Sequence, residues 1–175
     1  VLFYWKSTDS TGPDALLHKP PAMDRINYAR TLYGWLEDGT LLYGATTNTT
    51  TLDLWRTSTG TNASASPVVA TPFVEGFGAL SRDSRWLAYA SNESGRFEVY
   101  ATPYPSAQTK WPISVGGGTQ PAWRGDGKEL FYNPAPAEFA WVSVMTEPSI
   151  TFGNPETVPR PFRTGSPAVR RAFDI

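Results

Sequence analysis

The sequence predicts an all-β protein built from repeated antiparallel sheets, and three observations lead to this prediction. A short apolar tripeptide ending in tyrosine recurs along the chain, a turn segment with aspartate precedes most copies, and no stretch keeps the period of a helix. The tripeptides are Leu2-Phe3-Tyr4, Leu41-Leu42-Tyr43, Leu87-Ala88-Tyr89 and Leu130-Phe131-Tyr132, with tyrosine spacings of 39, 46 and 43 residues. These copies predict a structural unit of roughly 40 to 45 residues that repeats along the chain.

Each unit is expected to begin with a hairpin between a first and a second strand. Before three of the tripeptides an aspartate is followed by a small residue, in Asp38-Gly39, Asp83-Ser84 and Asp126-Gly127. Asp-Gly between apolar runs is typical of a two-residue turn of the primed type, because both residues tolerate a positive φ. We therefore expect first strands that end at Trp35, Leu80 and Trp123, and second strands that contain the tripeptides.

Two further strands are expected in each unit. Third strands are predicted at Asp14-Ala15-Leu16, Asp53-Leu54-Trp55, Glu98-Val99-Tyr100 and Phe139-Ala140-Trp141, and fourth strands around residues 26–28, 68–73, 110–114 and 156–162. Consecutive apolar residues in the second strands, such as Leu41 and Leu42, indicate sheets that are covered on both faces. Four-stranded antiparallel sheets that repeat at this spacing and cover one another are the blades of a β-propeller.

The predicted domain covers residues 1–175 and consists of about four blade equivalents. We expect blades at about residues 1–30, 31–74, 75–117 and 118–165, followed by a first strand at 166–175 that belongs to a further or shared blade. Two arrangements remain open: a segment of a larger propeller of about six or more blades, or a four-bladed ring that the last strand closes. An open segment would expose strand edges, through which copies of the chain can associate.

The composition excludes several classes of function. The 175 residues carry 15 Lys and Arg against 16 Asp and Glu, and this near-neutral balance provides no general attraction to nucleic acid or acidic membranes. The chain has no cysteine and one histidine, His18, which are too few ligands for a zinc site. No apolar run approaches the roughly 18 residues of a membrane helix, and the first six residues lack the features of a signal peptide. We expect no metal, no cofactor, no nucleic-acid binding and no membrane insertion.

Two patterns that could indicate catalysis are interpreted as structural. His18 lies beside two prolines and the sequence has no Gly-x-Ser-x-Gly segment, so a Ser-His-Asp triad is not expected. The glycines Gly116-Gly117-Gly118 precede a predicted strand and not a helix, so they are interpreted as a connection between blades and not as a phosphate site. No catalytic residue is therefore predicted.

One stretch of the chain resembles the TolB-type, WD-like propeller repeats. It runs from Leu80 to Arg96 and continues through Val99-Tyr100, Trp111-Pro112-Ile113-Ser114, Gly117-Gly118-Thr119-Gln120-Pro121-Ala122-Trp123 and Leu130-Phe131-Tyr132. The stretch is similar to the propeller fused to some bacterial membrane serine/threonine protein kinases, and related propellers form lids on prolyl-oligopeptidase-type peptidases. The resemblance implies a β-propeller and an extracytoplasmic, periplasmic location, but little about activity, because one architecture carries many functions.

The loops from the fourth strand of one blade to the first strand of the next cluster at one mouth of a propeller channel. Residues in or near these predicted loops are Arg25, Arg30, Glu75, Phe77 and Gln120. Their mix of charge and aromatic character suits a protein, a peptide or a small polar ligand. We predict a non-enzymatic scaffold for recognition, which the resemblance extends to the sensor region of a bacterial signalling protein. The alternative is the propeller lid of a prolyl-oligopeptidase-type peptidase or of a glycan-active hydrolase.

Overall fold

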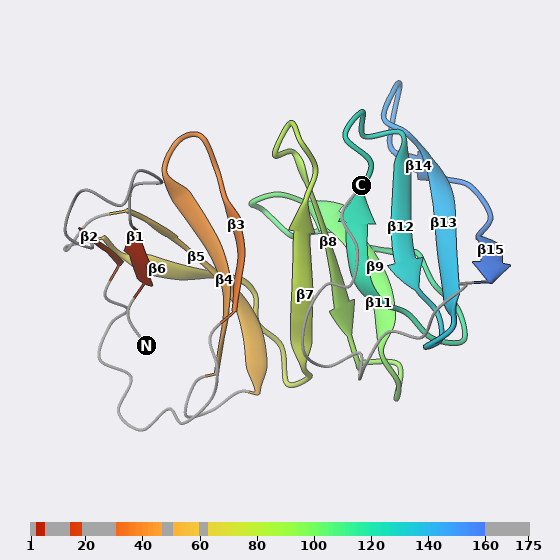
Figure 1. The fold of residues 1–175 in the computed structure, drawn as a ribbon, viewed down its shortest axis with the longest axis horizontal. Helices are drawn as coiled ribbons and strands as arrows, with labels where there is room; N and C mark the ends of the chain where they lie inside the picture. The colour runs from red at the N-terminus through yellow and green to blue at the C-terminus, as the bar shows by residue number, and fades with distance from the viewer. Residues whose placement is uncertain (1–2, 6–14, 19–30, 47–50, 60–62, 160–175) are drawn as a thin grey trace.

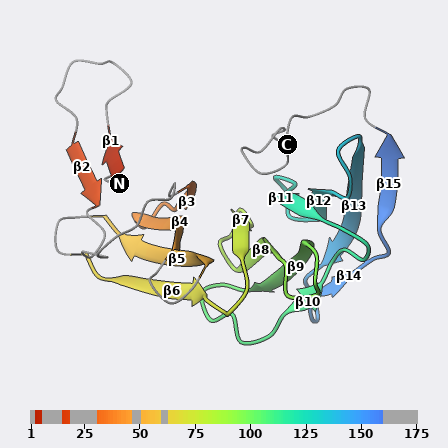
Figure 2. The same cartoon turned by 90° about the horizontal axis from the view of Figure 1, so that it is seen from below.

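The computed structural model describes residues 3–5, 15–18, 31–46, 51–59 and 63–159. Within these residues every regular element is a β-strand, and the strands form four antiparallel sheets. The sheets follow one another along the chain and fan out around an arc (Figure 1, Figure 2). This arrangement confirms the predicted all-β fold, in which four-stranded antiparallel sheets act as the blades of a propeller.

The first two sheets contain the N-terminal strands. The first sheet pairs β1 (Phe3–Trp5) with β2 (Ala15–His18), which correspond to the predicted second and third strands of the first unit. The second sheet has the order β3-β4-β5-β6 and consists of β3 (Leu32–Trp35), β4 (Thr40–Thr46), β5 (Leu52–Ser58) and β6 (Ala65–Val69). The strand predicted around residues 26–28 lies outside the described residues.

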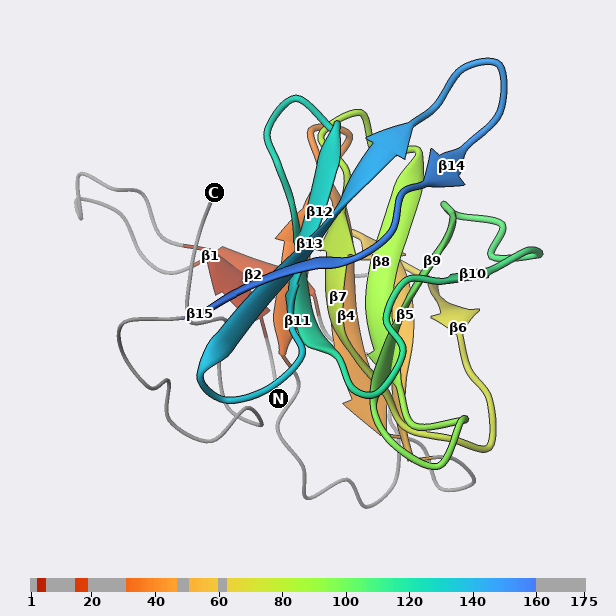
Figure 3. The same ribbon diagram turned by 90° about the vertical axis from the view of Figure 1, so that its right-hand side faces the viewer.

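The third and fourth sheets repeat the same strand order. The third sheet consists of β7 (Glu75–Leu80), β8 (Trp86–Ser91), β9 (Glu98–Pro103) and β10 (Trp111–Pro112). The fourth consists of β11 (Thr119–Trp123), β12 (Glu129–Asn133), β13 (Glu138–Met145), β14 (Thr151–Phe152) and β15 (Glu156–Pro159). Both β14 and β15 pair with β13, so two short strands share the last edge of this sheet (Figure 3).

The described first, second and third strands lie where the sequence predicted them, whereas the fourth strands of the second and third sheets differ from the prediction. The strand predicted at residues 68–73 ends at Val69. It stops there because Pro72 has no amide hydrogen and the Thr71 amide donates to the Glu75 carboxylate, at 3.2 Å, instead of to a strand. The expected first strand at 166–175 lies outside the described residues, so the blade limits and the two closure arrangements stay predictions.

The hairpins between first and second strands are present, but the predicted turn type is wrong. Each has a bond from the amide of Gly39, Ser84 or Gly127 to a carbonyl three residues earlier, on Leu36, Ser81 or Arg124. Among the described residues the three aspartates have no positive φ; the residue after each does, with φ of 82°, 55° and 72°. Each aspartate Oδ1 instead accepts the amide two residues later, at 2.8 Å, 3.1 Å and 3.0 Å. The loops are therefore longer than two residues, and the aspartates close them with side-chain bonds.

The core lies between neighbouring blades, whose apolar faces pack against each other. Between the second and third sheets, Leu42 and Leu54 belong to one cluster with Leu87 and Tyr89. Between the third and fourth sheets, the cluster contains the following residues: Ala79, Ala88, Val99, Ala101, Ile113, Trp123, Leu130, Tyr132, Ala140, Val142, Val144 and Ile150. Because Leu87 and Tyr89 face one neighbour while Ala88 faces the other, β8 is covered on both sides. Consecutive residues of the tripeptides are apolar because the second strand is covered on both faces.

The first strand of each four-stranded sheet lies on the inner side of the arc, with β6 and β10 on the outer side (Figure 2). Each of β3, β7 and β11 has an irregular register against its second strand. Such bulges bend a strand and redirect its side chains. In β7 and β11 the bulges contain Phe77 and Gln120, at φ of 55° and 53°.

The hairpin at Ser84 provides a test of backbone strain. A residue other than glycine at a left-handed φ costs about 1 kcal/mol, so Ser84→Gly should raise the free energy of unfolding by about this amount. The measurement is denaturant unfolding of both proteins. Ser149→Gly, at an exposed position without a positive φ, is the matched control and should give no gain. An unchanged stability for Ser84→Gly would contradict the strained turn.

Candidate recognition surface at one rim of the blades

Two kinds of loop meet at one end of the blades, which we call the connection rim. The rim consists of the connections from fourth to first strands, residues 70–74 and 113–118, and the turns from second to third strands, residues 92–97 and 134–137. It is the lower end of the blades in Figure 1. The first-to-second hairpins, residues 36–39, 81–85 and 124–128, lie at the opposite end, which we call the hairpin rim.

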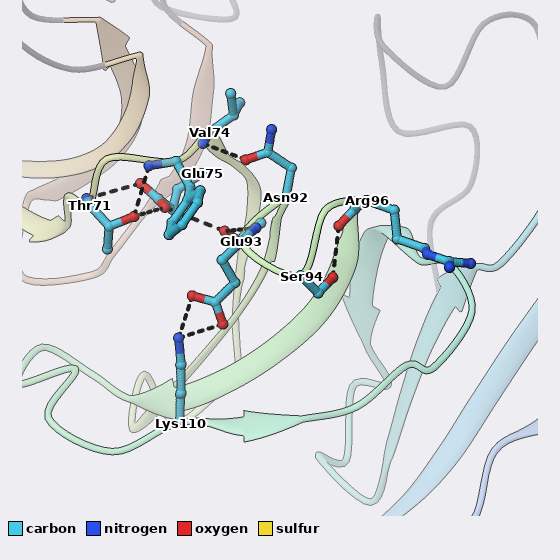
Figure 4. A network of polar contacts seen from close by, with 10 residues as sticks. Thr71, Val74, Glu75, Asn92, Glu93, Ser94, Arg96 and Lys110 are labelled. Atoms are coloured by element: carbon cyan, nitrogen blue, oxygen red, sulfur yellow. Dashed lines mark hydrogen bonds and ion pairs between the residues drawn. The ribbon is translucent and has the colours of Figure 1, made fainter.

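Glu75 holds the connection that enters the third blade. Its side chain is 1% exposed and begins β7. The carboxylate accepts hydrogen bonds from the hydroxyl and the amide of Thr71, the latter at 3.2 Å, and from the Ser91 hydroxyl at 3.4 Å (Figure 4). These bonds fold residues 71–75 back onto the end of β8. Glu75 therefore lies beneath the surface of the rim and fixes its loop, and its carboxylate is not exposed to solvent.

Burial determines the ionisation of Glu75. Removal from water raises the pKa of this carboxyl, and the Thr71 hydrogen bonds oppose that rise. The negative charge of Asp53, a buried residue of β5, raises the pKa further. The stability of the connection therefore depends on the protonation of Glu75.

Glu98 holds the next connection, residues 113–118, in place. Its carboxylate accepts hydrogen bonds from the Ser114 hydroxyl and from the Gly116 amide, the latter at 2.9 Å. Ser114 Oγ also accepts the Val99 amide at 2.8 Å, so one hydroxyl joins β9 to the connection. Gly118 lies against this hydroxyl, and a Cβ at this position would overlap Ser114 Oγ. The glycines that the sequence suggested as a connection are therefore fixed by a buried carboxylate.

A third set of contacts ties the turn at residues 92–97 to the connection before it. Asn92 Oδ1 accepts the Val74 amide at 2.8 Å, and the Asn92 amide donates to the Val74 carbonyl at 3.3 Å. Glu93 forms an ion pair with Lys110, whose ammonium lies 5.1 Å from the centre of the Tyr100 ring (Figure 4). The two loops therefore form one hydrogen-bonded unit.

Phe77 and Gln120 occupy equivalent bulge positions on the inner strands. Bulky residues rarely adopt a left-handed φ, and such strain persists only where the surroundings impose it. Gln120 is 2% exposed, and its Oε1 accepts Asn133 Nδ2 at 2.5 Å. The Phe77 ring packs edge-on against Phe97, with 6.5 Å between the ring centres. Both side chains thus connect a first strand to the connection-rim end of its own blade.

The structure brings part of the predicted set together. Glu75, Phe77 and Gln120 all lie at the connection-rim ends of β7 and β11, whereas Arg25 and Arg30 lie outside the described residues. Glu75 and Gln120 are buried, so their side chains position the rim; whether the rim binds a partner stays a prediction.

The sequence analysis missed two exposed aromatic residues of the rim. Phe73 is 42% exposed in the connection that Glu75 holds, and Phe97 is 36% exposed in the turn that Asn92 holds. Phe73 was assigned to a strand because it ends an apolar run. The signal for Phe97 was an aromatic residue directly after the turn-forming residues Ser94, Gly95 and Arg96.

The described residues limit what else the rim can hold. Among them, no group of three or more His, Cys, Asp and Glu side chains is placed to bind a metal ion. Nor does this part of the chain contain a helix long and apolar enough to cross a membrane. What the rim presents is a set of fixed loops with two exposed phenylalanines, the exposed Val115 and the exposed Arg96.

No protein family and no curated protein matches this sequence. Among solved structures, an Agrobacterium tumefaciens protein assigned as TolB has a similar fold, with a TM-score of 0.60 and 15% sequence identity. This match covers 85% of the chain and 53% of the Agrobacterium protein. TolB from Acinetobacter baumannii matches with a TM-score of 0.49 and 10% identity, over 87% of this chain and 37% of that one. The chain has the TolB-type β-propeller fold and spans about half the length of the Agrobacterium protein.

The raised pKa of Glu75 predicts a pH dependence of stability. The folded protein binds this proton more tightly than the unfolded chain, so the contribution of Glu75 is complete below its ordinary pKa of 4.5 and is lost as the pH rises through the raised value. Glu75→Gln stays neutral and avoids this loss. Relative to wild type, the variant should become more stable in thermal unfolding as the pH rises from 4.5 through the raised pKa of Glu75. A constant difference across this range, or the same trend in the exposed control Glu147→Gln, would refute the prediction.

Gly118→Ala tests the Glu98 connection. The added methyl group must displace Ser114, which leaves the buried Glu98 carboxylate without one of its two hydrogen bonds. Losing a partner of a buried polar group costs about 1 to 3 kcal/mol, and urea unfolding should show a loss of that size. Gly125→Ala is the control, because a Cβ there meets no atom within 4 Å. Equal losses in the two variants would count against the role of Ser114.

Proposed function

We propose that this chain is a non-enzymatic recognition module that binds a protein or peptide segment at the connection rim. The observation that carries the proposal is the exposure of Phe73 and Phe97 on two loops that hydrogen bonds fix in place. Binding sites on proteins are enriched in aromatic residues, which bury a large area and have few rotatable bonds.

The fixed loops favour binding because little conformational entropy remains to be lost. Hydrogen bonds hold the chain on both sides of Phe73, at Thr71 and at Val74. The bond between Val74 and Asn92 also connects this loop to the turn that contains Phe97. A surface that is ordered before binding loses less free energy on association than a flexible one. The exposed guanidinium of Arg96 adds a positive charge beside Phe97. The partner is expected to present apolar side chains together with an acidic group.

A binding role also agrees with the use of the buried acids. Glu75 and Glu98 are occupied with the connections of their own blade, and their carboxylates accept bonds from backbone amides and hydroxyls. The hydrogen bonds of Glu75 and Glu98 fix loops, and neither carboxylate is available to a substrate at the surface. We propose a scaffold for this reason.

The resemblance to propellers fused to bacterial membrane kinases supports a more specific proposal. In such a protein this module would be the sensor region on the periplasmic side of the membrane. Binding at the connection rim would then be the event that the sensor reports.

Peptides selected from a random library on the immobilised protein test the recognition function. Phe73→Ser with Phe97→Ser should weaken the selected peptides by roughly tenfold or more, because an aromatic binding residue contributes about 2 kcal/mol. The measurement is a titration by calorimetry. Met145→Ser, an exposed apolar residue near the hairpin rim, is the control and should bind as wild type does. Selected peptides that bind all three proteins equally would exclude the connection rim.

A further inference from the structure

Two crevices open between neighbouring blades at the hairpin rim, opposite the proposed recognition surface. The first, of about 270 Å³, lies between the second and third blades, and its lining includes Trp35, Leu80 and Arg82. The second, of about 360 Å³, lies between the third and fourth blades, and its lining includes Trp86, Trp123 and Lys128. Both crevices occur where the end of a first strand meets the hairpin of the adjacent blade. Cavities of this size hold a small ligand or one or two side chains of a peptide.

The second crevice combines an apolar base with charged walls. Trp86, Trp123 and Val144 contribute the apolar surface. Arg82 and Asp83 come from the hairpin of the third blade, and Asp126 and Lys128 come from the hairpin of the fourth. A ligand in this space would therefore contact two indoles and the charged groups of two blades.

The acids and the cations of the crevice differ in what they already bind. Asp83 accepts the Ser81 hydroxyl at 2.6 Å and the Arg85 amide, while Asp126 accepts the Lys128 amide and lies 3.6 Å from Arg124 Nε. By contrast, neither Arg82 nor Lys128 forms an ion pair with any residue that the structure describes. The hairpins thus use the aspartates for their own turns and leave the two cations available.

An indole in the same crevice has an unused donor. Trp123 Nε1 donates to the Ala79 carbonyl at 3.0 Å, but Trp86 Nε1 is buried and has no acceptor among the described residues. This nitrogen has essentially no accessible surface, so a ligand in the crevice does not contact it. The crevice therefore offers cations and aromatic surface together.

We infer that this crevice binds a peptide carboxylate that lies next to an apolar side chain. Arg82 and Lys128 bind the carboxylate, and the apolar side chain packs on Trp86 and Trp123. Asp83 and Asp126 balance the two cations, so a polyanion such as nucleic acid gains no net attraction, whereas a single carboxylate can contact the cations alone. The carboxylate belongs either to the end of a peptide or to an acidic side chain within it.

The first crevice gives the site room for a longer peptide. Arg82 lines both crevices, and Trp35, which is 48% exposed, lines the first. An extended peptide advances about 3.3 Å per residue, so a few residues suffice to pass from one crevice across Arg82 to the next. The site is separate from the connection rim, and it stands whether or not that rim binds a partner.

The experiment titrates the whole chain with three short acetylated peptides that share a leucine-phenylalanine segment near the C-terminus. One has a free terminal carboxylate, one is its amide, and one is an amide that contains a glutamate after the phenylalanine. The indole N–H signals of Trp86 and Trp123 in NMR spectra report binding at this crevice. We expect the simple amide to bind roughly tenfold or more weakly than a carboxylate form. Binding by the free acid alone assigns a peptide terminus, and binding by the glutamate peptide alone assigns an acidic side chain.

Arg82→Gln is the decisive variant, and Arg85→Gln is its matched control. Both arginines are exposed and lie on one hairpin, but only Arg82 lines the crevices. Arg82→Gln should weaken the carboxylate peptide by roughly fivefold or more, and Arg85→Gln should not. Phe73→Ser with Phe97→Ser should also leave binding intact, which separates this site from the proposed function. Four results would overturn the inference: a simple amide that binds as tightly as both carboxylate peptides, equal effects of the two arginine variants, shifts confined to other indoles, or no binding of any peptide up to about 10 mM.

Discussion

The structure depends on one constraint: no blade can bury its own apolar faces. In β8, Leu87 and Tyr89 point to one neighbouring sheet while Ala88 points to the other, so the strand is buried only when sheets lie on both sides. Burial of apolar surface contributes about 25 cal/mol per Å² and is the largest favourable term in folding. In repeat architectures of this kind each unit is stabilised mainly by contacts with its neighbours. The stacking of blades therefore buries their faces and leaves the loops of the two rims exposed.

This constraint explains which parts of the fold the sequence could predict. The tripeptides around Tyr43, Tyr89 and Tyr132 recur because the second strand of every blade meets the same two-sided environment. Their spacing therefore predicted the strand order and the propeller. The hairpins were predicted for a similar reason, since an aspartate closes each of them.

Local geometry was harder to predict, because it depends on contacts between residues that are distant in sequence. The turn type was wrong because the loop length decides whether the aspartate or its successor takes a left-handed φ, and an Asp-Gly pair does not reveal that length. Phe73 was assigned to a strand because the sequence does not show that Thr71 bonds to Glu75. Glu75 lies beside the connection where the sequence placed it, but its hydrogen bond with Ser91, sixteen residues away, depends on how β7 pairs with β8. The crevices depend on how two blades stack, which no single repeat indicates.

The length of β7 has a consequence for the whole module. This strand of six residues begins at Glu75 beside the connection rim and ends at Leu80 beside the crevices, and six extended residues span roughly 20 Å. Short peptides seated at the two proposed surfaces would thus lie roughly 20 Å apart and would not displace each other. With both proposed surfaces occupied, a single copy of this domain would act as an adaptor that holds two different molecules at a constant separation.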